Sequence, residues 1–106
     1  MKKLLKLLLK WLRKNPIKYK LVFVFWEDAN SSTTWEDITT IETMLPAVCC
    51  SIGFQIKKTD DAFVLTSDLS FDEDKKEFVI EEGGNTMVIP TKNILKITEI
   101  PLTYKF

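Results

Sequence analysis

The 106-residue chain contains no histidine at all. This absence excludes an imidazole general base, a histidine metal ligand and a histidine pH switch. Cysteine is scarce as well, and the only two, Cys49 and Cys50, are adjacent. Neighbours on a strand point to opposite faces and a vicinal disulfide is strained, so we expect reduced, structural thiols in a reducing cytoplasm. We expect no metal site and no cofactor.

Long apolar runs are missing from the N-terminal segment. Its longest run, Leu7–Leu9, is far too short to span a bilayer. A signal peptide is not expected, because Lys6 and Lys10 interrupt the apolar stretch and no small-residue cleavage site follows. The remaining composition, 45% hydrophobic and 28% charged, is typical of one globular domain of ordinary size.

Net charge is also missing, but the zero conceals a strong asymmetry. Fifteen basic residues balance fifteen acidic ones over the whole chain. Residues 1–20 carry eight of the bases and no acid, so residues 21–106 have a net charge of −8. A cationic tail on an anionic body is typical of an interaction segment.

The cationic tail has the periodicity of an amphipathic helix over about residues 2–14. Basic residues recur at three- and four-residue steps along one face, and leucines with Trp11 fill the other. Asn15-Pro16 is a plausible stop. We divide the chain into this basic arm (residues 1–16) and a β domain (residues 17–106). The interaction residues predicted in the arm are Lys3, Lys6, Lys10, Trp11, Arg13 and Lys14.

Three interpretations of the basic arm compete. Its apolar face packs on its own domain or on a sister subunit, with the lysines facing acidic residues. Alternatively it binds an anionic membrane surface reversibly, or it anchors to nucleic acid or to an acidic protein. Nucleic acid is the less favoured partner, because the rest of the chain is anionic and repels phosphate.

Downstream of the arm, short β-branched and aromatic runs predict a small β domain. A capping-box pattern, Thr33 with Glu36 or Thr34 with Asp37, predicts a helix over about 34–44. We expect Gly53 to mark a bulge or a sharp bend, Gly83-Gly84-Asn85 a hairpin turn and Pro90 a break before a 3₁₀ turn at 91–93. Five or six strands are expected, at about 17–26, 47–58, 62–67, 78–80, 86–89 and 94–100.

An acidic loop is expected at residues 68–77. Its spacing does not match a calcium-binding loop, so we interpret it as a solvated loop or as a surface that docks a basic partner, such as a neighbour's arm. Its acidic residues are Asp68, Asp72, Glu73, Asp74 and Glu77. No carboxylate pair, phosphate loop or nucleophile pattern indicates an enzyme.

The stretch from Trp35 to Ile100 resembles small Sm-like proteins with an SH3-like barrel, including uncharacterised phage-encoded members. The resemblance is carried by Trp35-Glu36-Asp37-Ile38, Ile52-Gly53-Phe54 and Val88-Ile89-Pro90. It implies a mainly β fold, in which a short helix precedes a bent barrel of five to six strands. It also implies ring-shaped homo-oligomers whose neighbouring subunits pair edge to edge.

RNA binding does not follow from the resemblance. Family members that bind RNA use polar residues after the second-strand hairpin and an Arg-Gly pair near the last turn. Here Ala62-Phe63 and Thr91-Lys92-Asn93 occupy those places. The sequence therefore predicts a non-catalytic, oligomeric interaction or scaffold protein of the cytoplasm, or of the virion if the chain is phage-encoded. Its arm docks to a neighbouring subunit or to a larger assembly.

Overall fold

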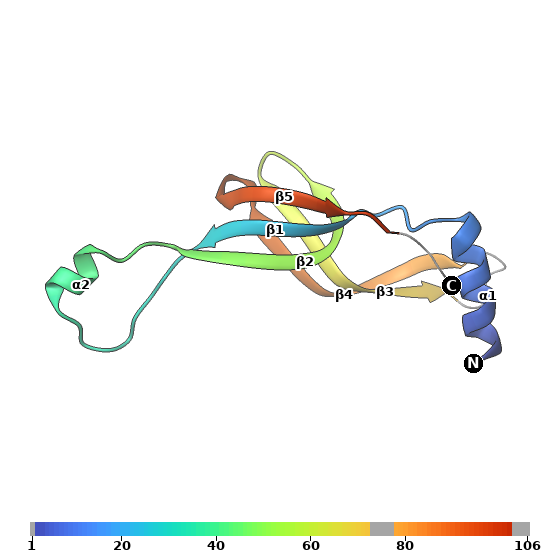
Figure 1. Cartoon of the computed structure of the whole chain (residues 1–106), viewed down its shortest axis with the longest axis horizontal. Coiled ribbons are helices and arrows are strands. Elements are labelled where there is room, and N and C mark those ends of the chain that lie inside the picture. Colours follow the sequence, from blue (N-terminus) through green and yellow to red (C-terminus); the bar gives the residue numbers. More distant parts are fainter. Residues whose placement is uncertain (1, 73–77, 103–106) are drawn as a thin grey trace.

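The computed structural model describes residues 2–72 and 78–102, which form a single five-stranded antiparallel sheet flanked by two helices (Figure 1). The strand order is β4-β3-β2-β1-β5. The elements in chain order are α1 (Lys3–Lys14), β1 (Leu21–Asp28), α2 (Ile38–Glu42), β2 (Ala47–Lys58), β3 (Ala62–Asp72), β4 (Val79–Pro90), the 3₁₀ helix η1 (Thr91–Asn93) and β5 (Ile94–Ile100).

The hydrophobic core lies on one face of this sheet. Val22 and Val24 alternate inward from β1, because side chains on a strand point to opposite faces with a period of two. Val24 lies opposite Ile97 of β5, and the core continues onto β3 and β4 through the pair Phe63 and Ile89. The fully enclosed cluster consists of Val22, Val24, Phe63, Leu65 and Ile89, with Trp26, Ile94 and Ile97 packed against it.

β2 bends across the sheet, as Gly53 suggested, but the irregularity in its pairing with β3 lies C-terminal to this glycine. The register with β3 shifts between Gln55 and Lys57 rather than at Gly53. Gly53 serves a close approach instead: a Cβ there would lie 3.0 Å from the backbone carbonyl oxygen of Thr66. The predicted bulge at Gly53 is therefore wrong in position.

β4 is one continuous strand, so the predicted hairpin turn at Gly83-Gly84-Asn85 is wrong. These residues pair with β3, with Gly83 opposite Leu69 and Gly84 opposite Asp68. The reason is that β3 continues through Asp72, five residues beyond the expected end at 67, and supplies a partner for the whole of β4. Only Asn85 has a left-handed backbone, with φ of 55°.

The connection from β4 to β5 matches the sequence prediction. Pro90 ends β4 with φ of −56°, and η1 follows at Thr91–Asn93. Thr91 ties this turn to the β2–β3 hairpin, because its N–H donates to the carbonyl oxygen of Asp61 at 3.1 Å and its hydroxyl donates to that of Thr59 at 2.8 Å. The bounds predicted for β2 and β5 are confirmed as well.

The sheet curls without closing. Across its concave side the hydroxyl of Ser51 on β2 lies 3.6 Å from the sulfur of Met87 on β4. The two outer strands, β4 and β5, are nevertheless not hydrogen-bonded to each other in the described residues. The mainly β class is confirmed, as is the strand number of five, whereas the structure shows an open, curled sheet and no closed barrel.

The helix predicted at 34–44 is much shorter in the structure. α2 begins after Asp37, and neither Thr33 nor Thr34 caps it through a side chain. The Ser32 hydroxyl donates instead to the Glu36 carboxylate at 2.7 Å, so these side chains satisfy one another in a loop. The first strand also begins later than predicted, at Leu21 rather than residue 17.

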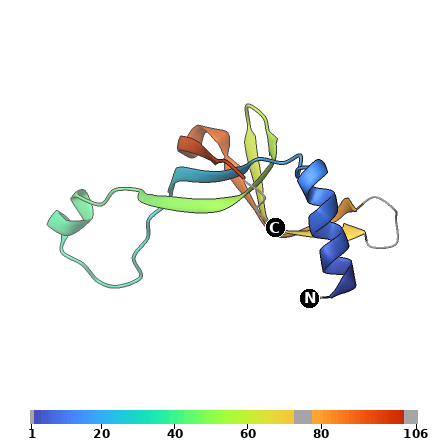
Figure 2. The ribbon, with the colours of Figure 1, turned by 45° about the vertical axis from the view of Figure 1, so that its right-hand side comes forward.

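Two projections extend the molecule to 62 × 28 × 23 Å. At one end lies the β1–β2 excursion (residues 29–46), which carries α2, and at the other end lies α1 (Figures 1 and 2). The radius of gyration is 19.1 Å. A compact domain of this length has a value of about 13 Å. The elongation comes from segments that project away from the sheet.

Candidate interaction surfaces

α1 rests on the far end of the β3–β4 hairpin. Leu12 is buried there, and the Trp11 ring meets Phe78 edge to face with centroids 6.2 Å apart. Asn15 ends the helix, since its N–H and its side-chain amide both donate to the Trp11 carbonyl oxygen. The apolar face of the helix therefore packs on its own domain, and Trp11, predicted as an interaction residue, contributes to that packing.

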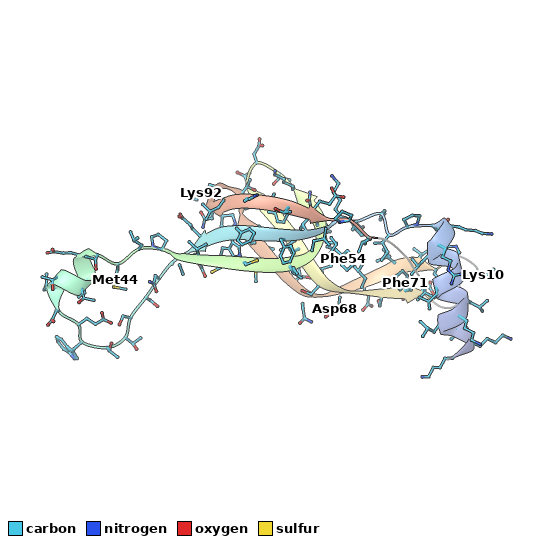
Figure 3. All side chains as sticks on the ribbon, viewed as in Figure 1. Lys10, Met44, Phe54, Asp68, Phe71 and Lys92 are labelled. Carbon is cyan, nitrogen blue, oxygen red and sulfur yellow. The ribbon has the colours of Figure 1, made fainter. Side chains whose placement is uncertain are left out.

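The N-terminal half of α1 is covered less completely than its C-terminal half. Leu4, Leu5 and Leu7 remain 43–47% exposed. A groove of about 450 Å³ lies between this half and the hairpin. Phe71, one of its lining residues, lies beside α1 (Figure 3). The lining of the groove is formed by Lys2, Leu4, Leu5, Leu8, Ser70, Phe71 and Phe78. An apolar groove bordered by a basic helix is suited to an apolar ligand that carries negative charge.

The basic face of α1 points to solvent along the full length of the helix. Its five predicted cationic residues are exposed, namely Lys3, Lys6, Lys10, Arg13 and Lys14. In the described part of the chain, none of them lies within ion-pair distance of a carboxylate. The ion pair found there joins Lys20 to Glu99 at 4.0 Å, between two largely exposed side chains. The positive face is thus available to an external anionic group.

The predicted acidic surface is brought together only in part. Asp68 lies on β3 rather than in a loop, and its carboxylate accepts a hydrogen bond from the side-chain amide of Asn85. Asp72 is the last residue of the same strand. Glu73, Asp74 and Glu77 lie outside the described residues. Asp68 therefore has a local structural partner.

The β1–β2 excursion, together with the end of β1 before it, forms a second acidic surface that the prediction missed. Residues 27–46 contain five acids and no base: Glu27, Asp28, Glu36, Asp37 and Glu42. The side-chain amide of Asn30 donates to the Leu45 carbonyl oxygen at 3.1 Å and so joins the two limbs of the excursion. The charge count alone could have revealed this surface, but the prediction concentrated on the denser acid run at 68–77.

Large apolar side chains of the excursion are exposed as well. Trp35 is fully exposed, Leu45 is 74% exposed and Ile38 is 67% exposed. Trp35 lies away from the core, whereas Trp26 packs on the core and donates to the Ser51 hydroxyl at 3.0 Å. An acidic segment with uncovered apolar side chains has the composition of a docking element.

The two edge strands form a third candidate surface. β4 pairs only with β3 and β5 pairs only with β1 in the described residues, so each has one side without a strand partner. Val88 on β4 is 62% exposed and Leu95 on β5 is 53% exposed. Unpaired edges of this kind are templates for adding a strand from another chain.

We identify no catalytic site and no metal site in the described residues. They bring together no group of three or more cysteine or acidic side chains that could hold a metal ion. Cys49 is half-buried and Cys50 is exposed, and both are free thiols on opposite faces of β2. Gly53, Gly83, Gly84 and Pro90 have backbone roles in the sheet and its turn, as described above. Over residues 2–72 and 78–102, no helix combines the length and apolarity needed to cross a membrane.

Comparison with known proteins adds no relative. No family model, no curated protein and no solved structure matches this chain. The surfaces described above are therefore the basis for assigning a function.

Proposed function

We propose that this protein is a non-catalytic interaction or scaffold protein that assembles with copies of itself through its sheet edges. The observation that carries the proposal is the pair of unpaired edges, β4 and β5, at opposite sides of one sheet. β5 of one copy can pair with β4 of the next, which continues the sheet from subunit to subunit. Such a contact joins two different surfaces, so it closes into a ring if the rotation allows it.

The accessible surface supports assembly. The chain exposes 8325 Å² at a mass of 12.3 kDa. A folded monomer of that mass exposes about 6,100 Å². The difference of about 2,200 Å² exceeds the roughly 800 Å² that each partner buries in an interface of standard size. If a subunit buries part of this surface against its neighbours, its remaining accessible surface is similar to that of an ordinary globular protein of its mass.

The resemblance to Sm-like proteins agrees with this proposal. The order β4-β3-β2-β1-β5, with η1 between β4 and β5, is the order expected for a small bent barrel opened along one seam. In the proposed ring, the neighbouring subunits cover that seam. A phage-encoded member of the family acting in the cytoplasm or the virion is consistent with this function, and we include that origin in the proposal.

Light scattering with edge variants tests the assembly. Val88→Lys on β4 and Leu95→Lys on β5 place charges on edge strands, which is a common natural device against strand addition. Both side chains are exposed, so the fold tolerates them. We expect each variant to lower the mass of the assembly. Phe25→Lys is the control, because Phe25 is 38% exposed and its strand β1 pairs there with β2 on one side and β5 on the other. A wild-type protein that is monomeric at micromolar concentration would overturn the proposal.

Binding of the basic arm to an anionic membrane is the second candidate function. The observation that favours it is the row of exposed leucines, Leu4, Leu5 and Leu7, beside the basic face of α1. It predicts co-sedimentation with anionic vesicles, weakening with salt and lost on deletion of residues 1–16. Absence of co-sedimentation at low salt would exclude it. Non-specific nucleic-acid binding by the arm predicts a steep salt dependence and is tested in the same way with labelled RNA and DNA.

A further inference from the structure

The two ends of the molecule are complementary in charge. The β1–β2 excursion and the strand end before it carry five acids and no base, while residues 1–20 carry eight bases and no acid. Lys10 on α1 and Met44 in the excursion lie at opposite ends of the long axis (Figure 3). The molecule is 62 Å long, so the two ends do not meet within one chain.

Apolar complementarity coincides with the charge. The excursion presents Trp35, Ile38 and Leu45, which are at least 67% exposed. The opposite end presents the groove beside α1, whose apolar wall consists of Leu4, Leu5 and Leu8. Burying a large aromatic side chain in such a groove removes apolar surface from water and so stabilises a complex. Each end thus supplies what the other lacks, in charge and in apolar contact.

We propose that the excursion of one copy docks on α1 and its groove in the next copy. This inference rests on the proposed self-association, but it assigns a second contact, distinct from the pairing of sheet edges. It identifies the acidic surface that receives the basic arm as residues 27–46. The contact is head-to-tail, so every added subunit offers a free excursion at one end and a free arm at the other until a ring closes.

A second copy of the chain accounts for the surface properties of both ends of the molecule, whereas any other binding partner accounts for only one end. An anionic membrane or a nucleic acid accounts for the basic face of α1, but each repels the acidic excursion. A basic partner protein accounts for the excursion and leaves the arm without a function. Since the arm and the excursion always occur at equal concentration on the same chain, a copy of this protein is the partner that satisfies both.

Charge reversal with complementation tests the contact in the full-length chain. The arm variant is K6E/K10E and the excursion variant is D37K/E42K, and all four positions are exposed. Each variant places like charges at the contact, so we expect each to weaken self-association by about tenfold or more in analytical ultracentrifugation at low salt. Mixing the two variants restores opposite charges at every contact. We therefore expect the mixture, and the chain carrying all four substitutions, to recover the wild-type mass.

Matched controls isolate the contact from a general effect of charge. K57E/K58E and D60K/D61K make the same changes of charge at exposed positions of the β2–β3 hairpin, and we expect both to keep the wild-type mass. Trp35→Ser tests the apolar part, and since this side chain is fully exposed, the substitution leaves the fold intact. We expect it to weaken association without changing the thermal unfolding of the dilute protein.

Four results overturn the inference. Arm and excursion variants that keep the wild-type mass exclude the contact, and so does a mixture that fails to restore association. Loss of binding to phosphatidylserine vesicles by K6E/K10E, with unchanged mass for D37K/E42K, assigns the arm to membranes instead. If Val88→Lys lowers the mass while the charge-reversed variants do not, edge pairing stands and only this inference fails. If the wild-type protein is a monomer, both fail together.

Discussion

The packing of Gly83 against Thr66 provides a sharp test of the fold. A Cβ added at Gly83 would lie 2.9 Å from the Oγ1 atom of Thr66 and 3.1 Å from its Cγ2 atom. Thr66 has no easy way to move, since it is only 2% exposed. Its hydroxyl donates to the Gly84 carbonyl oxygen at 2.8 Å and lies 3.1 Å from the Thr86 hydroxyl. Gly83→Ala therefore forces a clash or breaks these hydrogen bonds.

The expected cost follows from two opposing effects. Overpacking a well-filled site costs about 1–3 kcal/mol. Replacing glycine by alanine in a strand returns about 0.5–1 kcal/mol, because the unfolded chain loses conformational freedom. The clash prevails, and we expect Gly83→Ala to lower the free energy of unfolding by about 1–2 kcal/mol.

The adjacent glycine is the matched control. A Cβ at Gly84 meets the Asp68 Cβ at 3.6 Å, an ordinary van der Waals contact, and its φ is not positive. Gly84→Ala should stabilise the protein by about 0.5 kcal/mol. Thermal unfolding followed by circular dichroism then separates the two variants by about 6–20 °C, at roughly 4–8 °C per kcal/mol.

The outcome also decides between the strand and a hairpin turn. A turn at Gly83-Gly84-Asn85 requires positive φ at its glycines, so alanine would be costly at both positions. Equal destabilisation by Gly83→Ala and Gly84→Ala would refute the continuous β4. Equal stability of the two variants would refute the contact between Gly83 and Thr66.

Two further perturbations test α1 and the irregularity at Asn85. Leu12→Ala removes the buried anchor of α1 and should weaken the docking of the helix by about 2 kcal/mol. We expect roughly 30-fold faster amide exchange in residues 3–14, while exchange in β1 stays slow. Unchanged exchange would contradict the docked helix. Asn85→Ala should lower the free energy of unfolding in urea by about 1 kcal/mol more than Asn85→Gly does. Both substitutions remove the hydrogen bond to Asp68, but only alanine is strained at φ of 55°. Equal losses of stability would contradict the left-handed backbone at Asn85.

Local signals in the sequence predicted several elements well. The three- and four-residue spacing of lysines and leucines predicted α1, and Asn15 ends it. Pro90 predicted the end of β4 and the 3₁₀ turn. β-branched and aromatic runs predicted the bounds of β2 and β5. Each of these signals depends on residues that are close together in the sequence, so the sequence alone is enough to predict the element.

Pairing between distant segments decided what local signals could not. The Gly-Gly-Asn stretch has the composition of a turn, but β3 extends to Asp72 and holds it in a strand. The helix predicted at 34–44 is reduced to α2, and the loop that carries Trp35 leaves the sheet altogether. A helix signal of Thr and acidic residues at 33–37 was satisfied by side chains within the loop instead.

The sequence by itself determined the asymmetry of charge, the amphipathic arm, the mainly β class and the absence of histidine chemistry. The charge asymmetry and the lack of histidine follow from composition alone, and the arm and the β class follow from short-range periodicity. Only the tertiary structure decided where the charges lie. It packs Trp11 and Leu12 on the hairpin, leaves the lysines of α1 facing solvent and projects the acidic excursion from the opposite end. The separation of opposite charges to the two ends of a 62 Å molecule depends on strand order and register, because these set the directions in which the connecting segments leave the sheet.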